Sequence, residues 1–128
     1  SHVATGMVIR AFAAHPEYRK SEEATRAGNL LKSRFFQPDV FNSRKSMDYW
    51  FKFQFPFWWT NLLTVLDSLM RMEFSAEDAD IKRGLEWLIE HQEKDGGWKA
   101  AYGRGRIPNV DLWVTFAVCR ILKYLLGG

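Results

Sequence analysis

The stretch that decides the fold is Arg83-Gly84-Leu85-Glu86-Trp87-Leu88-Ile89-Glu90-His91-Gln92-Glu93-Lys94-Asp95-Gly96-Gly97-Trp98. Apolar residues recur at three- and four-residue spacing from Ile81 through Leu85 to Leu88, which is typical of one face of an amphipathic helix. Two adjacent glycines follow, and they favour a helix exit because glycine adopts backbone conformations closed to other residues. The stretch therefore predicts a helix with a defined end.

We expect this helix to extend from Ser75 to Glu93. Ser75 and Asp78 have the spacing of a capping box. Trp98 follows the glycines closely enough for its ring to fold back on the helix end, and the amide of Gln92 is expected beneath that ring. From there the amide could bond to unpaired backbone groups of a neighbouring helix.

Seven positions of this stretch match a known repeat at fixed spacing: a basic residue, a small residue, an aromatic, an aliphatic, glutamine, glycine and tryptophan. They are Arg83, Gly84, Trp87, Leu88, Gln92, Gly96 and Trp98. The pattern resembles the QW repeat of squalene and hopene cyclases, which are related in fold to the protein prenyltransferases. Three other stretches resemble a microbial group of squalene-cyclase-like proteins, and this resemblance covers nearly the whole chain. They are Gly28-Asn29-Leu30-Leu31, Arg34-Phe35-Phe36 and Phe55-Pro56-Phe57-Trp58-Trp59.

The chain also carries an internal repeat of 55 residues, marked by Thr5, Thr60 and Thr115. Its period is that of one helical hairpin. The predicted helices are Val3 to about Ala14, Glu17 or Ser21 to Phe36, Pro56 to about Met72, Ser75 to Glu93, and Asn109 or Asp111 to Leu126. Residues Met47 to Phe51 are expected to form an irregular aromatic cover.

These helices alternate between polar-backed and nearly all-apolar, as an α/α toroid requires of its outer and inner helices. The resemblance thus implies an all-α fold, a toroid fragment of about two and a half hairpins within a single domain, 1–128. We expect it to be the C-terminal part of a longer chain. The inner helices should expose apolar surface, through which the fragment could pair with itself or with the rest of its own chain.

Composition agrees with one globular domain: 128 residues, of which 47% are hydrophobic and 16% aromatic. A net charge of +3 without a long basic run argues against nucleic-acid binding. Cys119 is the only cysteine and lies in an apolar run, so we expect a buried packing thiol and a cytoplasmic protein. Ser1-His2 is interpreted as a tag remnant, and we predict neither a signal peptide nor a transmembrane segment.

The reactions known in this family have no clear counterpart here. The segment Asp78-Ala79-Asp80-Ile81 lacks the last carboxylate of the Asp-x-Asp-Asp motif by which cyclases protonate an alkene, so we interpret it as helix capping. Cys119, His15 and His91 do not have the spacing of the prenyltransferase zinc ligands. We therefore predict no metal, no cofactor and no identified catalytic residue.

Three groups of residues are candidates for substrate binding. Aromatic residues near the starts of two inner helices could line an apolar pocket or simply pack in the core, and basic residues beside glycines could receive a diphosphate or form a solvated loop. An acid in an apolar helix could face the cavity or pair with Arg71. The candidates are Trp58, Trp59, Trp113, Arg104, Arg106 and Asp67.

The leading hypothesis is a terpenoid-cyclase-like or prenyltransferase-like ring that holds an isoprenoid or other hydrophobic substrate, with the fragment alone not catalytic. One alternative is a helical-repeat scaffold for protein association. Another is a carbohydrate-active α/α toroid, in which tryptophans stack on sugars and paired carboxylates carry the reaction. No convincing carboxylate pair is evident for the last.

Overall fold

The computed structural model describes residues 1–40, 46–56 and 59–127, and every regular element in this part of the chain is helical. The all-α prediction is therefore confirmed. The elements are α1 (His2–Ala14), α2 (Glu22–Lys32), the 3₁₀ helix η1 (Met47–Phe51), α3 (Leu62–Arg71), α4 (Ala79–Glu90) and α5 (Val110–Leu126).

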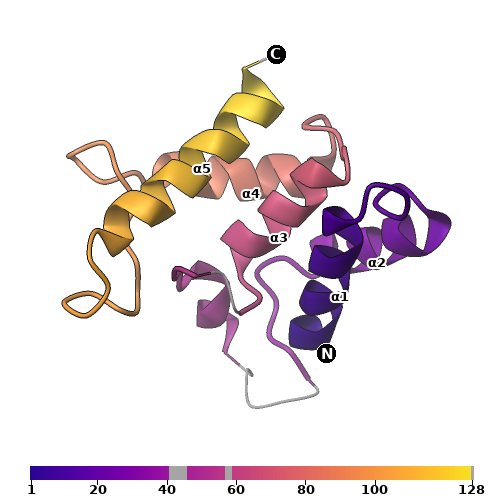
Figure 1. Ribbon diagram of the computed structural model, residues 1–128, viewed down its shortest axis with the longest axis horizontal. Helices are drawn as coiled ribbons and strands as arrows, with labels where there is room; N and C mark the ends of the chain where they lie inside the picture. The colour runs from indigo at the N-terminus through magenta and orange to yellow at the C-terminus, as the bar shows by residue number, and fades with distance from the viewer. Residues whose placement is uncertain (41–45, 57–58, 128) are drawn as a thin grey trace.

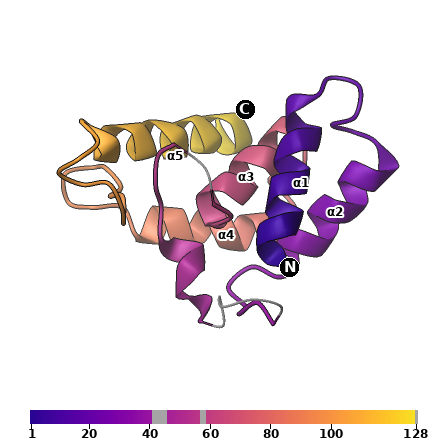
Figure 2. The ribbon, with the colours of Figure 1, turned by 60° about the horizontal axis from the view of Figure 1, so that its bottom comes forward.

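Helix α3 occupies the centre of the molecule. Figures 1 and 2 both show it between α1 and α5, and all the other helices pack against it. Eight of its ten residues are buried, because apolar side chains occupy most of its circumference. The sequence-based prediction that this helix is buried on more than one side is thus confirmed.

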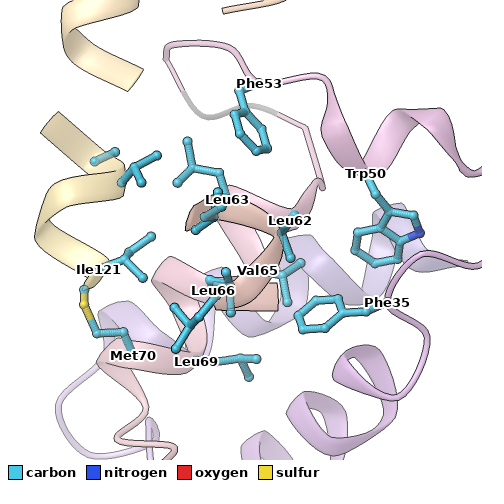
Figure 3. Packing of buried hydrophobic residues seen from close by; sticks show 14 of the residues in the cluster. Phe35, Trp50, Phe53, Leu62, Leu63, Val65, Leu66, Leu69, Met70 and Ile121 are labelled. Carbon is cyan, nitrogen blue, oxygen red and sulfur yellow. The ribbon is translucent and has the colours of Figure 1, made fainter. Parts of the chain in front are cut away.

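The core is formed by side chains that leave α3 in different directions (Figure 3). On one side Leu62 and Val65 approach Phe35 and Trp50, whose rings meet edge to face at 5.5 Å between centroids. On the other side Ile121 of α5 lies near Leu66 and Met70. All of these residues belong to one buried cluster, so a single core joins all five α-helices.

The predicted start of α3 at Pro56 is wrong, because Asn61 caps the helix instead. Its side-chain oxygen accepts from the Thr64 N–H at 3.0 Å, and the Thr64 hydroxyl accepts from the Asn61 N–H at 3.0 Å. Ahead of Pro56, the Phe53 carbonyl accepts from the Ala101 N–H at 2.7 Å. That contact comes from a distant part of the chain.

Helices α2 and α4 are shorter than predicted. Helix α2 ends at Lys32 rather than Phe36, because the Ser33 hydroxyl donates to the Leu30 carbonyl and the chain turns. Helix α4 begins after Asp78, whose carboxylate accepts from two backbone N–H groups, and not at Ser75. It ends at Glu90 instead of Glu93.

Helix α5 begins where predicted but not with the predicted cap. Asn109 precedes it with a φ of 58° and makes no side-chain capping bond. The carboxylate of Asp111 instead accepts from the Ala100 N–H at 2.8 Å. Asp111 therefore ties the preceding loop to the helix.

The seven-position motif joins α4 to α5 through its last residue. Trp98 folds back as predicted: its indole N–H donates to the Leu88 carbonyl at 2.8 Å, and the side chain is buried. Its backbone N–H donates to the Thr115 hydroxyl at 2.9 Å. The expectation for Gln92 was wrong, because its amide donates to the Gly96 carbonyl within the same loop and not to a neighbouring helix.

Exposed apolar residues gather on the two helices that flank α3. Met7 and Val8 are exposed on α1, while Leu112 and Phe116, one turn apart, are exposed on α5. Cys119 lies one turn further and is also exposed, so the predicted buried thiol is wrong. The run around Cys119 is apolar, but only one face of α5 packs on α3.

Asp78 caps the start of α4 and also forms an ion pair with α2. Lys32 pairs with it at 2.8 Å. Burial raises the pKa of Asp78, but the hydrogen bonds from Lys32 and the Ile81 N–H outweigh burial, so this pKa lies below its ordinary value of 3.8. A depressed carboxylate pKa stabilises the fold above the unfolded-state pKa, and that contribution is lost as pH falls through the folded-state value.

We expect Asp78→Ala to lower the free energy of unfolding by about 1–2 kcal/mol at neutral pH through loss of the cap and the ion pair. Asp78→Asn keeps an N-cap side chain and should cost less. Urea unfolding followed by circular dichroism checks both. The difference between the original chain and Asp78→Asn should shrink as the pH falls below 3.8, the ordinary pKa of the carboxyl group, and a difference independent of pH would contradict the ion-pair contribution.

Candidate functional site

A cavity of about 370 Å³ lies where η1, the segment before α3 and the loop before α5 meet. Its volume is in the range typical of small-molecule sites. Most of the lining is aromatic or aliphatic, with two basic side chains. The principal lining residues are Tyr49, Lys52, Gln54, Phe55, Trp59, Thr60, Tyr102, Arg106 and Ile107.

Two hydrogen bonds to backbone carbonyls hold the walls of the cavity together. The Ala101 N–H donates to the Phe53 carbonyl at 2.7 Å, which fastens the loop before α5 to the segment before α3. The side-chain amide of Asn61 donates to the Lys52 carbonyl at 3.2 Å. The N-cap of α3 thus also fixes one wall of the cavity.

A glycine turn sets the other wall. Gly103 has a φ of 83°, a conformation that favours glycine, and its carbonyl accepts from the backbone N–H groups of Arg106 and Ile107. The turn folds the chain back so that these two residues line the cavity. A side chain on Gly103 would also meet Ile107, with 2.8 Å between a Cβ and the Ile107 Cδ1.

The lining combines exposed rings with two cations, Lys52 and Arg106. Trp59 is 46% exposed and Tyr102 is 52% exposed, so apolar faces are open to solvent where a ligand could cover them. Among the residues that the structure describes, neither Lys52 nor Arg106 forms an ion pair. Such a cavity fits a ligand with an apolar body and an anionic group.

His2 supports the cavity from behind. It is buried, and its ring is hydrogen-bonded to the Tyr49 hydroxyl, while Arg34 donates to its other ring nitrogen at 3.2 Å. Burial lowers the pKa of His2; Asp39 opposes this, and Arg34 and the N-terminal amine lower it further. Tyr49 is therefore held in place by a residue that we had interpreted as a tag remnant.

The structure brings together some of the residues proposed from the sequence. Trp59 and Arg106 line the cavity, and Trp113 stacks on the cavity residue Phe55 with 5.1 Å between ring centroids. Arg104 is not a lining residue, because it pairs with Asp111 at 3.3 Å. Trp58 lies outside the described residues.

Asp67 lies elsewhere, on α3. Its carboxylate pairs with Arg71 at 3.0 Å, which confirms the alternative interpretation, and also with Arg120 of α5 at 2.5 Å. The second partner was not predicted, since 53 residues separate it from Asp67. Asp67 borders a different cavity.

Sequence reasoning missed Lys52, Tyr49 and Tyr102 as lining residues. Tyr49 was expected only as part of an aromatic cover, and Lys52 directly follows that segment. The available signal was the position of an aromatic segment beside a lysine and ahead of the tryptophans. It gave no indication of the loop that would complete the site.

Two further properties are established for residues 1–40, 46–56 and 59–127. No group of three or more histidine, cysteine, aspartate or glutamate side chains is placed to hold a metal ion. None of the helices is long and apolar enough to cross a membrane.

The chain was also compared with known proteins. Searches of family models, of curated proteins and of solved structures gave no match to the chain.

Proposed function

We propose that the chain is part of an α/α toroid related to terpenoid cyclases and prenyltransferases, and that it binds an isoprenoid or similar apolar compound bearing an anionic group. The observation that carries this proposal is the aromatic cavity in which Trp59 and Arg106 lie with Lys52. An apolar chain would cover the exposed rings, and the anionic group would bind the two cations.

The toroid part of the proposal is supported by two features. All seven motif positions are present at the spacing of the repeat. Trp98, the last of them, joins the hairpin of α3 and α4 to α5 through Thr115. Helix α3 packs against both α1 and α5, while α2 packs chiefly on α1 and α4 packs on α3. No residue is assigned a catalytic role, and the proposal concerns binding.

The test uses three probes: farnesyl diphosphate, the uncharged alcohol farnesol, and inorganic diphosphate. Isothermal titration with the original chain is expected to give the tightest binding for farnesyl diphosphate, because only this probe satisfies both the rings and the cations. Arg106→Gln should weaken farnesyl diphosphate about tenfold, as expected for one charge-assisted contact, and leave farnesol unchanged. Trp59→Ala should weaken both isoprenoids several-fold.

Arg104→Gln is the matched control. It removes the same charge from the same loop, but Arg104 pairs with Asp111 and does not line the cavity. Equal losses for Arg104→Gln and Arg106→Gln would show a general effect of charge and would overturn the assigned site.

A second candidate, a scaffold for protein association, is favoured by the exposed apolar residues of α1 and α5, among them Met7, Leu112 and Phe116. Exposed apolar groups of this kind are common at protein interfaces. The same titrations separate the two candidates. Failure of all three probes to bind would reject the isoprenoid site and favour association.

A further inference from the structure

A second cavity, of about 380 Å³, lies among α1, α3 and α5 and shares no lining residue with the aromatic one. Each of the three helices contributes an arginine to it: Arg10, Arg71 and Arg120. Among the described residues of its lining, only Asp67 is acidic. Because three guanidinium groups and one carboxylate line this cavity, it carries an excess of positive charge.

Asp67 fixes two of the three arginines. Its Oδ2 accepts from Arg71 Nε at 3.0 Å and its Oδ1 from Arg120 Nη2 at 2.5 Å. The Asp67 side chain is only 13% exposed, so these pairs are partly shielded from water. The carboxylate therefore holds two guanidinium groups, one from α3 and one from α5, in set positions.

Binding capacity remains after these pairs are formed. The side chains of Arg71 and Arg120 stay 46% and 38% exposed, while the Nε of Arg120 is itself buried and has no hydrogen-bond acceptor among the described residues. A buried donor without an acceptor is uncommon, since leaving it unpaired is unfavourable. Arg10 forms no ion pair with another described residue either.

We propose that this cavity binds a phosphate group. Guanidinium groups donate paired N–H bonds to tetrahedral oxyanions, and arginine is favoured wherever a phosphate is recognised in this way. A phosphate dianion matches the excess charge better than a carboxylate monoanion does. The phosphate could be free or part of a small phosphomonoester, because both present the same oxygens.

The proposal is tested by isothermal titration with inorganic phosphate and with phenyl phosphate at constant ionic strength, with acetate as the monoanion. Saturable binding of phosphate, and none of acetate, is expected. Tighter binding of phenyl phosphate would identify a phosphomonoester site, and equal or tighter binding of inorganic phosphate a site for the free ion.

Three variants make the test specific. Arg10→Gln removes an exposed side chain without an ion-pair partner, so the fold should persist, and phosphate binding should weaken about tenfold. Arg120→Lys keeps the charge but loses the fork of donors, and it should weaken binding several-fold. Arg26→Gln, on the exposed face of α2, is the matched control and should leave binding unchanged.

Absence of saturable phosphate binding by the original chain would overturn the proposal, as would equal losses in Arg10→Gln and Arg26→Gln. Circular dichroism of each variant confirms that the helices are retained. Because the aromatic cavity shares none of these residues, Arg106→Gln should bind phosphate here as the original chain does.

Discussion

Replacing Trp98 with alanine is expected to lower the free energy of unfolding by about 3–5 kcal/mol, the range for a buried tryptophan. The side chain is 4% exposed, so its removal leaves a cavity between α4 and α5. The Leu88 carbonyl also loses the indole N–H that donates to it at 2.8 Å. Both losses occur where Trp98 joins α4 to α5.

Urea unfolding monitored by circular dichroism measures this effect. Trp98→Phe keeps most of the ring volume but not the N–H. Its free energy of unfolding should therefore lie between those of the original chain and Trp98→Ala. Trp113→Ala is the matched control: this tryptophan is 48% exposed and stacks only on Phe55 among the described rings. Its loss should cost about 0.5–1.5 kcal/mol, and equal costs for both alanine variants would contradict the role of Trp98.

The second large effect is expected at Gly6, where α1 meets the segment before α3. A Cβ built on Gly6 would lie 2.0 Å from the Thr60 Oγ1 and 2.8 Å from the Thr60 Cβ. Rotation of the threonine cannot remove the second clash. We therefore expect Gly6→Ala to lower the free energy of unfolding by about 1–3 kcal/mol, although alanine favours a helix by about 1 kcal/mol over glycine.

Gly84→Ala is the control for Gly6→Ala. The nearest atom to its Cβ would be the Leu62 Cδ1 at 3.1 Å, the end of a flexible side chain, so the cost should be much smaller. Adding Thr60→Ala to Gly6→Ala should recover part of the lost stability, which a double-mutant cycle measures. If Thr60→Ala recovers no stability, the destabilisation by Gly6→Ala does not arise from contact with Thr60.

The helices were largely predictable because their signals are local. Apolar spacing located all five, and the glycines before Trp98 gave the turn that lets its ring reach the Leu88 carbonyl. The start of α3 was not predictable in this way. The described residues Phe55, Pro56 and Trp59 are as apolar as a helix requires, but the helix begins only after Asn61, whose side chain accepts from the Thr64 N–H.

The aromatic cavity was only half predictable. Arg104 and Arg106 both adjoin glycines in the sequence, and composition does not distinguish them. Their partners do: Asp111 binds Arg104, while the turn at Gly103 brings Arg106 to the cavity. The arginine cavity depends on three helices that meet only in the folded chain, so its members could not be grouped beforehand.

The central position of α3 has a thermodynamic consequence for the two cavities. Thr60 lines the first and directly precedes the cap of α3, while Asp67 lines the second two helical turns further along. A ligand that binds in one cavity and displaces α3 therefore changes the shape of the other cavity. Linkage makes any such coupling reciprocal: each ligand would alter the affinity for its counterpart by the same factor.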